Sequence, residues 1–240
     1  MKVLGIIPAR YDSSRFPGKP LIDLKGKTMI QRVYEGASGS QLIDKLVVAT
    51  DDQRIIAEVE SFGGNAILTK NTHQSGTDRC AEVLSQFPAY ELVINIQGDE
   101  PLVSAEQLDQ LLGAFLDKTV QIATLVHPDV TPSDLLNVNR IKVLADHQQN
   151  AIYFSRSAVP NMHYAKVHHF PWLRHIGLYA YRSAVLKQIA SLAPCALEQA
   201  ESLEQLRWLY YGYKIRLVQT HIETPNIDVP EDVEKVLPFL

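Results

Sequence analysis

Val3-Leu-Gly-Ile-Ile-Pro8, followed by Arg10-Tyr-Asp-Ser-Ser-Arg15-Phe-Pro-Gly-Lys19-Pro-Leu, is the stretch of sequence that decides the fold. Its first part is a short apolar run, which is typical of a buried strand. Its second part is a loop rich in Ser, Pro and Gly that carries three cations. Open α/β sheets bind ligands at the carboxyl ends of their strands, and clustered cations suit a polyanion such as a triphosphate. The alternative is a solvated basic loop.

Strand and helix signals alternate on the C-terminal side of this stretch. We predict strands over residues 45–49, 65–69 and 91–96, and helices from Thr28, over 51–62, over about 77–85 and from Ser104. Thr28 with Gln31, and Ser104 with Gln107, fit the capping-box pattern of a helix start. This alternation predicts a mostly parallel sheet with helices on both faces.

The second half of the chain departs from this alternation. After a strand at 121–126, the segments 139–144 and 151–155 predict an antiparallel hairpin, and residues 160–173 predict a loop or lid. A helix over about 197–211, a strand over 214–219 and a helix from Pro230 are expected to follow. No repeat or low-complexity linker interrupts the chain, which favours one domain over residues 1–240.

The composition is that of an ordinary globular protein. The chain has 240 residues, of which 46% are hydrophobic and 21% charged, and its net charge of −4 gives no overall basic field for nucleic acid. No secretory signal and no run of 18 apolar residues is found, so no membrane association is expected. Cys80 and Cys195 do not form a metal-type pair, which indicates a cytoplasmic protein with free thiols. P-loop, dinucleotide-binding and zinc motifs are lacking.

Gln97-Gly98-Asp99-Glu100-Pro101 follows the predicted strand that ends at Ile96. A carboxylate at that end of a strand faces the ligand crevice, and Asp99 there suits Mg²⁺, which binds through one or two carboxylates plus substrate phosphates. The alternative is a turn before Pro101.

His73-Gln-Ser-Gly-Thr-Asp-Arg79 lies between a predicted strand and a predicted helix. The backbone of Ser75-Gly76 suits recognition of the edge of a base. The alternative is a plain helix cap by Ser75 or Thr77, which explains the hydroxyls but requires neither Gln74 nor Gly76.

Three segments of the second half carry further polar candidates. They are Ser155-Arg156, Arg174-His175-Ile-Gly-Leu-Tyr179 and Glu201-Ser-Leu-Glu204-Gln205-Leu-Arg207. Taken singly, each is explained by structure alone, with His175 as a hydrogen-bonded core histidine and Glu204 as a surface charge.

Seven segments in this order resemble the 3-deoxy-manno-octulosonate (Kdo) cytidylyltransferase family. They are Ile-Pro-Ala-Arg10…Lys19-Pro, His73–Arg79, Asn95-Ile-Gln-Gly-Asp99-Glu-Pro, Tyr153-Phe-Ser-Arg156, Arg174-His175-Ile-Gly, Leu203-Glu-Gln-Leu-Arg207 and Asp228-Val-Pro-Glu-Asp232. The resemblance extends from about residue 3 to residue 235, and the ordered set is far more specific than any single member.

The resemblance implies a Rossmann-like nucleotide-diphospho-sugar transferase fold, a homodimer in which residues 128–180 form the sugar side and the dimer contact, and Mg²⁺ as cofactor. It implies the reaction of CTP with Kdo to give CMP-Kdo and pyrophosphate, for lipopolysaccharide biosynthesis. Catalytic roles fall to Arg10, Lys19, Asp99 and Asp228, nucleotide binding to Arg10, Arg15, Lys19, Gln74, Ser75, Gly76 and Gln97, sugar binding to Gln97, Arg156, His175, Tyr179, Glu204 and Gln205, and metal binding to Asp99 and Asp228.

Two segments depart from the family pattern. Asn226-Ile-Asp228-Val229 replaces the usual Gly and Thr around the second aspartate, so the support of Asp228 is altered. The segment between Pro160 and Pro171, with His163, His168 and His169, differs on the expected sugar side, which allows a Kdo variant such as the 8-amino sugar. Another keto-acid sugar, such as a sialic-type acid, is the alternative substrate, and a catalytically silent nucleotide-binding regulator is the alternative of another class.

Overall fold

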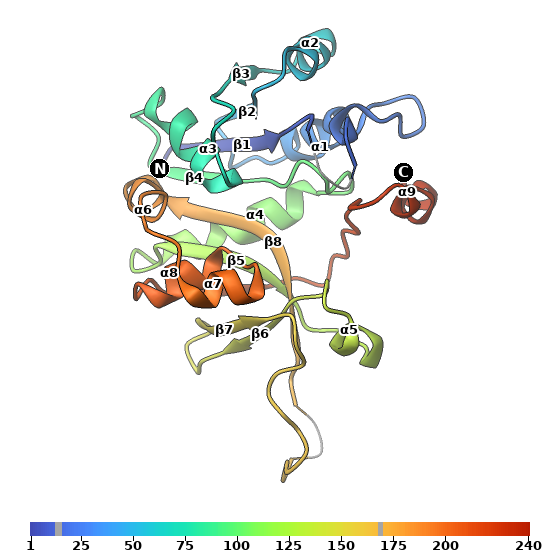
Figure 1. Ribbon diagram of the computed structural model, residues 1–240. Coiled ribbons are helices and arrows are strands. Elements are labelled where there is room, and N and C mark those ends of the chain that lie inside the picture. Colours follow the sequence, from blue (N-terminus) through green and yellow to red (C-terminus); the bar gives the residue numbers. More distant parts are fainter. Residues whose placement is uncertain (13–15, 168–169) are drawn as a thin grey trace. The chain divides into compact units, whose positions relative to one another are not determined.

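The strand predicted at the start of the chain is present and lies inside a parallel sheet (Figure 1). β1 (Val3–Ala9) pairs in parallel with β2 (Lys45–Thr50) on one side and with β4 (Leu92–Asn95) on the other, and β2 pairs with β3 (Ala66–Leu68). Leu4, Ile6 and Ile7 are fully buried. A continuous apolar run is therefore explained by burial of both faces of the strand.

The computed structural model describes residues 1–12, 16–167 and 170–240, which form two compact units. Unit 1 contains Met1–Leu112, Ala180–Ala190 and Thr224–Leu240, and unit 2 contains Gly113–Tyr179 and Ser191–Glu223. The interpretation of residues 1–240 as one domain, with 128–180 as a subregion, stays a prediction.

Five helices of unit 1 begin within about two residues of their predicted starts: α1 (Met29–Ser38), α2 (Gln53–Ser61), α3 (Gly76–Ser85), α4 (Ala105–Gly113) and α9 (Glu231–Val236). The sequence did not predict α6 (Ser183–Ile189) or the short 3-10 helices η1 (Lys19–Leu21) and η3 (Leu237–Phe239). Thr28 caps α1 by accepting from the Gln31 amide, but the Gln31 side chain donates to Glu35, so the predicted capping box is only half formed. α4 buries Leu108, Leu111 and Leu112 as predicted.

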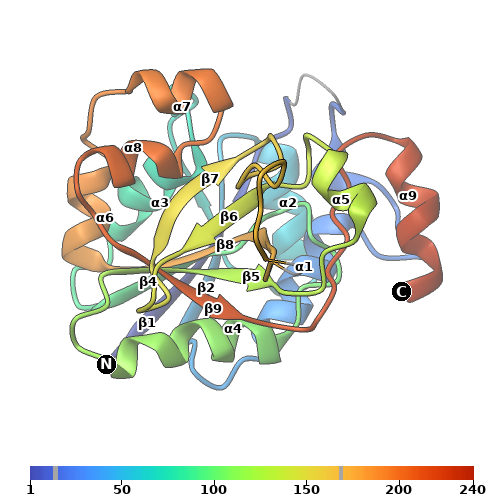
Figure 2. The same cartoon turned by 90° about the horizontal axis from the view of Figure 1, so that it is seen from below.

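Unit 2 contains parallel and antiparallel strands. β5 (Ile122–His127) pairs in parallel with β9 (Ile215–Gln219) and neighbours β8 (Leu173–Arg182), whose last residues belong to unit 1. The predicted antiparallel hairpin is β6 (Lys142–Ala145) with β7 (Ala151–Ser155), and the two strands lie side by side in Figures 1 and 2. The sequence did not indicate that β8 begins at Leu173.

The helices of unit 2 correct one prediction. They are η2 (Ala114–Leu116), α5 (Pro132–Leu136), α7 (Ala196–Glu201) and α8 (Gln205–Tyr210). The single helix predicted over 197–211 is wrong, because Ser202 adopts a left-handed conformation with φ of 51° and ends α7. Residues 160–172, where they are described, contain neither helix nor strand, as predicted. Within the described ranges, no helix has the length and apolar character needed to cross a membrane.

Candidate active site

Lys19 joins two segments that are distant in sequence. Its ammonium nitrogen lies 2.7 Å from Asp99 Oδ2 and 2.9 Å from the carbonyl oxygen of Ile227. The Ile227 amide in turn donates to the carbonyl oxygen of Asp99 at 3.0 Å. These three bonds bring Asp228, the next residue, beside the Asp99 turn, so the two predicted metal ligands belong to one corner of unit 1.

The segment around Asp228 is held by two neighbouring side chains, Asn226 and Asp232, for which the sequence predicted no supporting role. Asn226 Nδ2 donates to Asp228 Oδ2 at 2.9 Å, and Asp232 Oδ2 accepts from the amides of Asp228 and Val229 at 3.1 and 3.2 Å. Burial of Asp232 works against ionisation, but hydrogen bonds from Lys235 and these amides lower its pKa. Asn226 and Asp232 therefore support the aspartate without the family's usual threonine.

Arg10 follows β1 and is anchored toward α3. Its guanidinium donates to the His73 carbonyl oxygen, and the His73 ring pairs with Glu82, which also accepts from the Lys70 amide at 3.1 Å. His73 and Glu82 thus orient a residue predicted to bind the triphosphate. His73 lies in the loop before α3 and Glu82 lies on α3, and no sequence pattern predicts that two such residues pair. Arg15 lies outside the described residues.

Ser75 begins α3 with a complete capping box. Its hydroxyl accepts from the Asp78 amide at 3.1 Å, and the Asp78 carboxylate accepts from the Ser75 amide at 3.1 Å. The helix-cap alternative therefore describes Ser75 well, and Thr77 is buried in the helix. A Cβ on Gly76 would meet its nearest neighbours, in Asn95 and Pro8, at 3.5 Å, which is ordinary van der Waals contact, so the packing of the fold does not by itself require glycine here.

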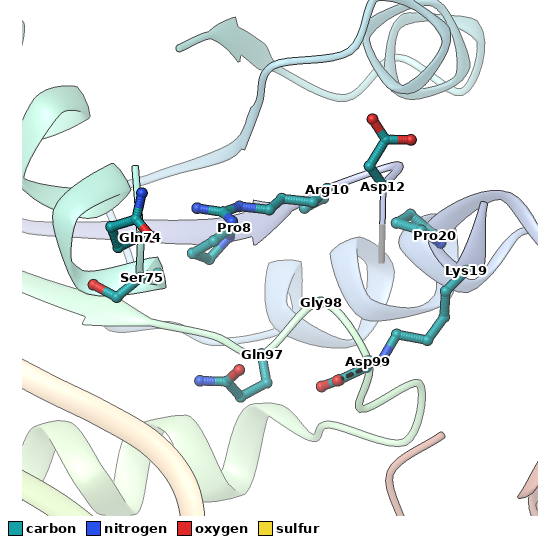
Figure 3. A pocket seen from close by; sticks show the side chains of 12 residues that line it. Pro8, Arg10, Asp12, Lys19, Pro20, Gln74, Ser75, Gln97, Gly98 and Asp99 are labelled. Carbon is teal, nitrogen blue, oxygen red and sulfur yellow. Dashed lines mark hydrogen bonds and ion pairs between the residues drawn. The ribbon is translucent and has the colours of Figure 1, made fainter. Parts of the chain in front are cut away.

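A polar cavity of about 540 Å³ occupies the carboxyl ends of β1 and β4 (Figure 3). Its lining residues are Pro8, Ala9, Arg10, Asp12, Lys19, Pro20, Gln74, Ser75, Gly76, Gln97, Gly98 and Asp99. Figure 3 shows Arg10, Gln97, Lys19 and Asp99 around this space, with the Lys19–Asp99 pair at one end. Sequence reasoning missed Asp12, although it lies in the same loop as the predicted cations.

Gly98 is required by a close approach of backbone. A Cβ at this position would lie 2.7 Å from the Pro8 carbonyl oxygen, a distance that real side chains do not adopt. The absence of a side chain therefore lets the turn between Gln97 and Asp99 lie directly against the end of β1.

The carboxylates at this corner suit Mg²⁺ only if the nucleotide supplies further ligands. Asp99 and Asp228 offer oxygen donors, which Mg²⁺ prefers. Within residues 1–12, 16–167 and 170–240, no group of three or more His, Cys, Asp or Glu is placed to hold a metal. Two carboxylates completed by phosphate oxygens fit the donor set, whereas an all-protein cage does not.

The predicted sugar-binding residues all belong to unit 2, apart from Gln97. His175, on β8, has its Nε2 2.9 Å from Thr124 Oγ1, and its ring contacts those of Phe154 and Tyr179 with centroid distances of 5.0 and 5.3 Å. Because the single hydroxyl proton of Thr124 reaches the Leu178 carbonyl at 2.8 Å, we assign the Nε2 proton to the histidine. The core-histidine alternative describes His175 well, and contact with a sugar stays a prediction.

Burial sets the ionisation of this cluster. It lowers the pKa of His175 to about 3, with a further contribution from Arg174, so the imidazole is neutral at physiological pH. Burial and the nearby Glu204 carboxylate raise the pKa of Tyr179 well above its usual value. Glu204 is half-buried and close to the phenol, and Gln205 is only 6% exposed, so neither is a free surface group.

Arg156 follows β7 and is tied to the end of α7. Its amide donates to Glu201 Oε2 at 2.8 Å. Its guanidinium donates to the carbonyl oxygens of Glu201, Val138 and Ser202 at 2.6, 3.0 and 3.3 Å. Unit 1 therefore holds the nucleotide candidates and unit 2 the sugar candidates, and their convergence on Asp99 stays a prediction.

Comparisons with known proteins identify the family of the chain. The family model described as Cytidylyltransferase matches residues 4–215. The chain belongs to the cytidylyltransferase family. It is 51% identical to the 3-deoxy-manno-octulosonate cytidylyltransferase of Parabacteroides distasonis, covering 100% of this chain and 98% of the relative, and 46% identical to that of Syntrophobacter fumaroxidans, covering 100% and 97%.

Solved structures extend this result to the fold of the cytidylyltransferase. A structure of CMP:2-keto-3-deoxy-manno-octonic acid synthetase complexed with CTP matches with a TM-score of 0.94 at 41% identity, over 100% of this chain and 98% of the other. The 4-diphosphocytidyl-2C-methyl-D-erythritol synthase of Anaerococcus prevotii matches with a TM-score of 0.62 at 15% identity, over 99% and 97%, and shows the fold alone. The predicted family, the mostly parallel α/β fold and the enzyme class of nucleotidyltransferase are confirmed.

Proposed function

We propose that this cytidylyltransferase transfers the cytidylyl group of CTP to 3-deoxy-manno-octulosonate, giving CMP-Kdo and pyrophosphate for lipopolysaccharide biosynthesis. The observation that carries the proposal is that Lys19 and Asp99, which line a polar cavity, are bonded to each other and to the backbone of Ile227, the residue before Asp228. The names of full-length relatives at 43–51% identity support the same reaction.

The cavity of unit 1 suits CTP. Lys19 and Arg10 line it, and with Arg15 of the same loop they would neutralise the triphosphate. The loop Gln74-Ser75-Gly76 would lie against the cytosine, whose polar edge needs paired donors and acceptors once it is removed from water. Gln97, on the same cavity, would contact the nucleotide or the sugar.

Asp99 and Asp228 would hold Mg²⁺ together with phosphate oxygens of the nucleotide. When bound, Mg²⁺ supplies charge for the reacting phosphate and favours ionisation of the attacking hydroxyl. Lys19 already binds Asp99 and the backbone of Ile227, so it would keep the two carboxylates in place while it offsets the charge that builds on pyrophosphate.

The sugar acid needs a cation for its carboxylate and several donors and acceptors for its hydroxyls. Arg156 has five N–H donors, and three of them serve carbonyl groups in the described chain, which leaves one on each terminal nitrogen for a carboxylate. His175, Tyr179, Glu204 and Gln205 would bind the hydroxyls.

The reaction itself is a displacement at phosphorus. The anomeric hydroxyl attacks the α-phosphorus, a new O–P bond forms in line with the bond that breaks, and pyrophosphate leaves. Positioning and charge neutralisation carry most of the catalysis in such transfers. Since His175 is neutral with a pKa of about 3, it would orient the sugar by hydrogen bonding and would not act as an acid near neutral pH.

The proposal has three further parts, which concern the oligomer, the location and a second acceptor. We propose a homodimer on the basis of the family alone. We propose the cytoplasm as its location because both Cys80 and Cys195 are free thiols. We propose 8-amino-Kdo as a second acceptor because the segment between Pro160 and Pro171 departs from the family.

Pyrophosphate release from CTP with a panel of sugar acids tests this function. We expect turnover with Kdo or 8-amino-Kdo in the presence of Mg²⁺, and little turnover with a sialic-type acid. Turnover only with a sialic-type acid would support the alternative substrate, and CTP binding without turnover on any acid would indicate a regulator.

A further inference from the structure

Lys142 is a buried cation in the middle of a strand. It lies on β6, opposite Ser155 of β7 and Arg174 of β8, and is only 1% exposed. Its ammonium donates to the carbonyl oxygens of Asn137, Arg140 and Arg156 at 3.0, 2.7 and 2.5 Å. An ammonium has three N–H donors, so each of them has a partner.

These carbonyl groups belong to two parts of the backbone, residues 137–140 and Arg156, which meet at one side chain. Asn137 and Arg140 enclose Val138, whose carbonyl accepts from Arg156 Nη1 at 3.0 Å. Lys142 also binds the carbonyl of Arg156 itself. It therefore fixes both the backbone from which the Arg156 side chain extends and the segment against which the guanidinium rests.

Glu201 contacts the same region through its carboxylate and its backbone carbonyl. We call Lys142, Glu201 and the backbone groups that they bind around Arg156 the frame. Its carboxylate accepts from the Ser155 hydroxyl and the Arg156 amide, both at 2.8 Å, and its carbonyl accepts from Arg156 Nε at 2.6 Å. Arg156 is thus held at its amide, its carbonyl and its guanidinium.

A lysine in this place is costly to bury. Burial lowers the pKa of Lys142; the Arg156 charge acts in the same direction, and the carboxylates of Glu201 and Asp134 oppose it. A buried apolar residue would avoid this cost, so stability alone gives little reason for a lysine. The three carbonyl partners, and the arginine that they frame, give a functional reason.

We propose that Lys142 is a positioning residue that sets the place of the Arg156 side chain and through it the affinity of the enzyme for its acidic sugar. The inference rests on the proposed function, in which Arg156 binds the sugar carboxylate. Lys142 itself lies behind Arg156 in the frame and would not touch the sugar.

Steady-state kinetics of Lys142→Met tests the proposal. We expect the KM for the sugar acid to rise about tenfold or more while the KM for CTP changes less than about twofold, because the affected arginine serves one substrate only. Val143→Ala is the matched control, since Val143 is the next residue of β6 and is 2% exposed. It should lower stability and leave the ratio of the two KM values unchanged. An equal rise in sugar KM in both variants would overturn the proposal.

A double-mutant cycle with Arg156→Ala separates positioning from general damage. If Lys142 acts through Arg156, Lys142→Met should change the sugar KM less than about twofold in the Arg156→Ala background. A further tenfold rise there would show that Lys142 acts by another route. Should Lys142→Met fail to fold, Lys142→Gln, which keeps N–H donors, takes its place in the cycle.

Hydrogen exchange gives a readout that is independent of activity. In Lys142→Met the Arg156 amide, which donates to Glu201, should exchange at least about tenfold faster, while amides of β1 keep their wild-type rates. Unchanged exchange at Arg156 would contradict the positioning role. Faster exchange at Arg156 in the variant, together with no pyrophosphate release by the wild-type enzyme with Kdo or 8-amino-Kdo, would refute the proposed function but would leave the contacts of Lys142 with the Arg156 backbone established.

Discussion

Lys19 and Asp99 in unit 1 meet beside a cavity, with side chains 13% and 26% exposed, whereas His175 and Tyr179 in unit 2 lie in a cluster of aromatic rings in tilted and edge-on contact. The first pair forms an ion pair between the start of the short helix η1 and the turn that follows β4. The second is neutral and is part of a strand. Polar groups of unit 1 can thus be altered without loss of core packing, whereas those of unit 2 serve the fold as well as any ligand.

The largest expected effect concerns the two half-buried carboxylates of unit 1. Asp99→Asn or Asp228→Asn should lower kcat by about 10²-fold or more, because each removes charge that stabilises the transition state. Steady-state rates at saturating Mg²⁺ measure this, and the far-ultraviolet circular dichroism should match that of the wild type. Near-normal rates in either variant would exclude that residue from the metal site.

The choice between CTP and UTP tests whether the loop at Ser75 and Gly76 in unit 1 recognises the base. CTP should be preferred over UTP by at least about tenfold in kcat/KM, since a mismatched base edge leaves buried polar groups unpaired. Gly76→Val should reduce the use of CTP much more than it reduces stability, because a Cβ at Gly76 meets only ordinary contacts. Equal use of CTP and UTP would show that this loop does not read the base.

Gln205→Ala tests whether the buried polar residues of unit 2 bind the sugar. The KM for the sugar should rise by several-fold to about tenfold, with little change for CTP, because one hydrogen-bonding group is worth about 1 kcal/mol or somewhat more. Parallel changes in both KM values, together with lower stability, would indicate a structural role only.

The smallest expected effect is the contribution of His175 to the pH dependence of stability. Its absence would show that the polar residues of unit 2 are not set apart from those of unit 1 by burial. The folded protein has a His175 pKa of about 3, against about 6.5 when unfolded, so the unfolded state binds the proton first and stability falls as pH decreases from about 6.5 toward 3. Between pH 7.5 and 5.5 this amounts to about 1.4 kcal/mol.

Urea unfolding of the wild type and of His175→Gln at both pH values measures this difference. The variant should lose that part of the pH dependence while the other histidines act equally in both proteins. The same loss of stability in both would mean that His175 is not held neutral by burial. A kcat profile with a pKa near 6.5 that disappears in His175→Gln would contradict our view that His175 moves no proton.

The sequence predicted elements whose patterns are local. Leu108, Leu111 and Leu112 repeat with helical spacing, and all three are buried on α4. It failed at Ser202, because a left-handed non-glycine residue between two helical patterns has no reliable local signal. It also missed the start of β8, since Arg174 and His175 break an apolar pattern and their hydrogen-bond partners, Glu223 and Thr124, are distant in sequence.

In the candidate site, too, some residues could be predicted from local motifs and others could not. The ordered motifs led to Arg10, Lys19, Ser75, Gly76 and Asp99, and the structure brings these to one cavity. Their supporting residues were not predictable. Glu82 acts on Arg10 through His73, and Asn226 acts on Asp228 through a single amide hydrogen bond. Such contacts depend on loop geometry, which neither periodicity nor residue type determines.

The bond from Lys19 to the Ile227 carbonyl joins residues 208 positions apart and has a consequence for synthesis of the chain. While the ribosome has translated only as far as β9, Lys19 and Asp99 can meet, but Asp228 does not yet exist. The nascent polypeptide therefore carries its phosphate-binding loop long before it can carry both carboxylates. If Asp228 is needed for catalysis as proposed, turnover would begin only after the segment that follows β9 has emerged and formed its bonds to Lys19 and Asp99.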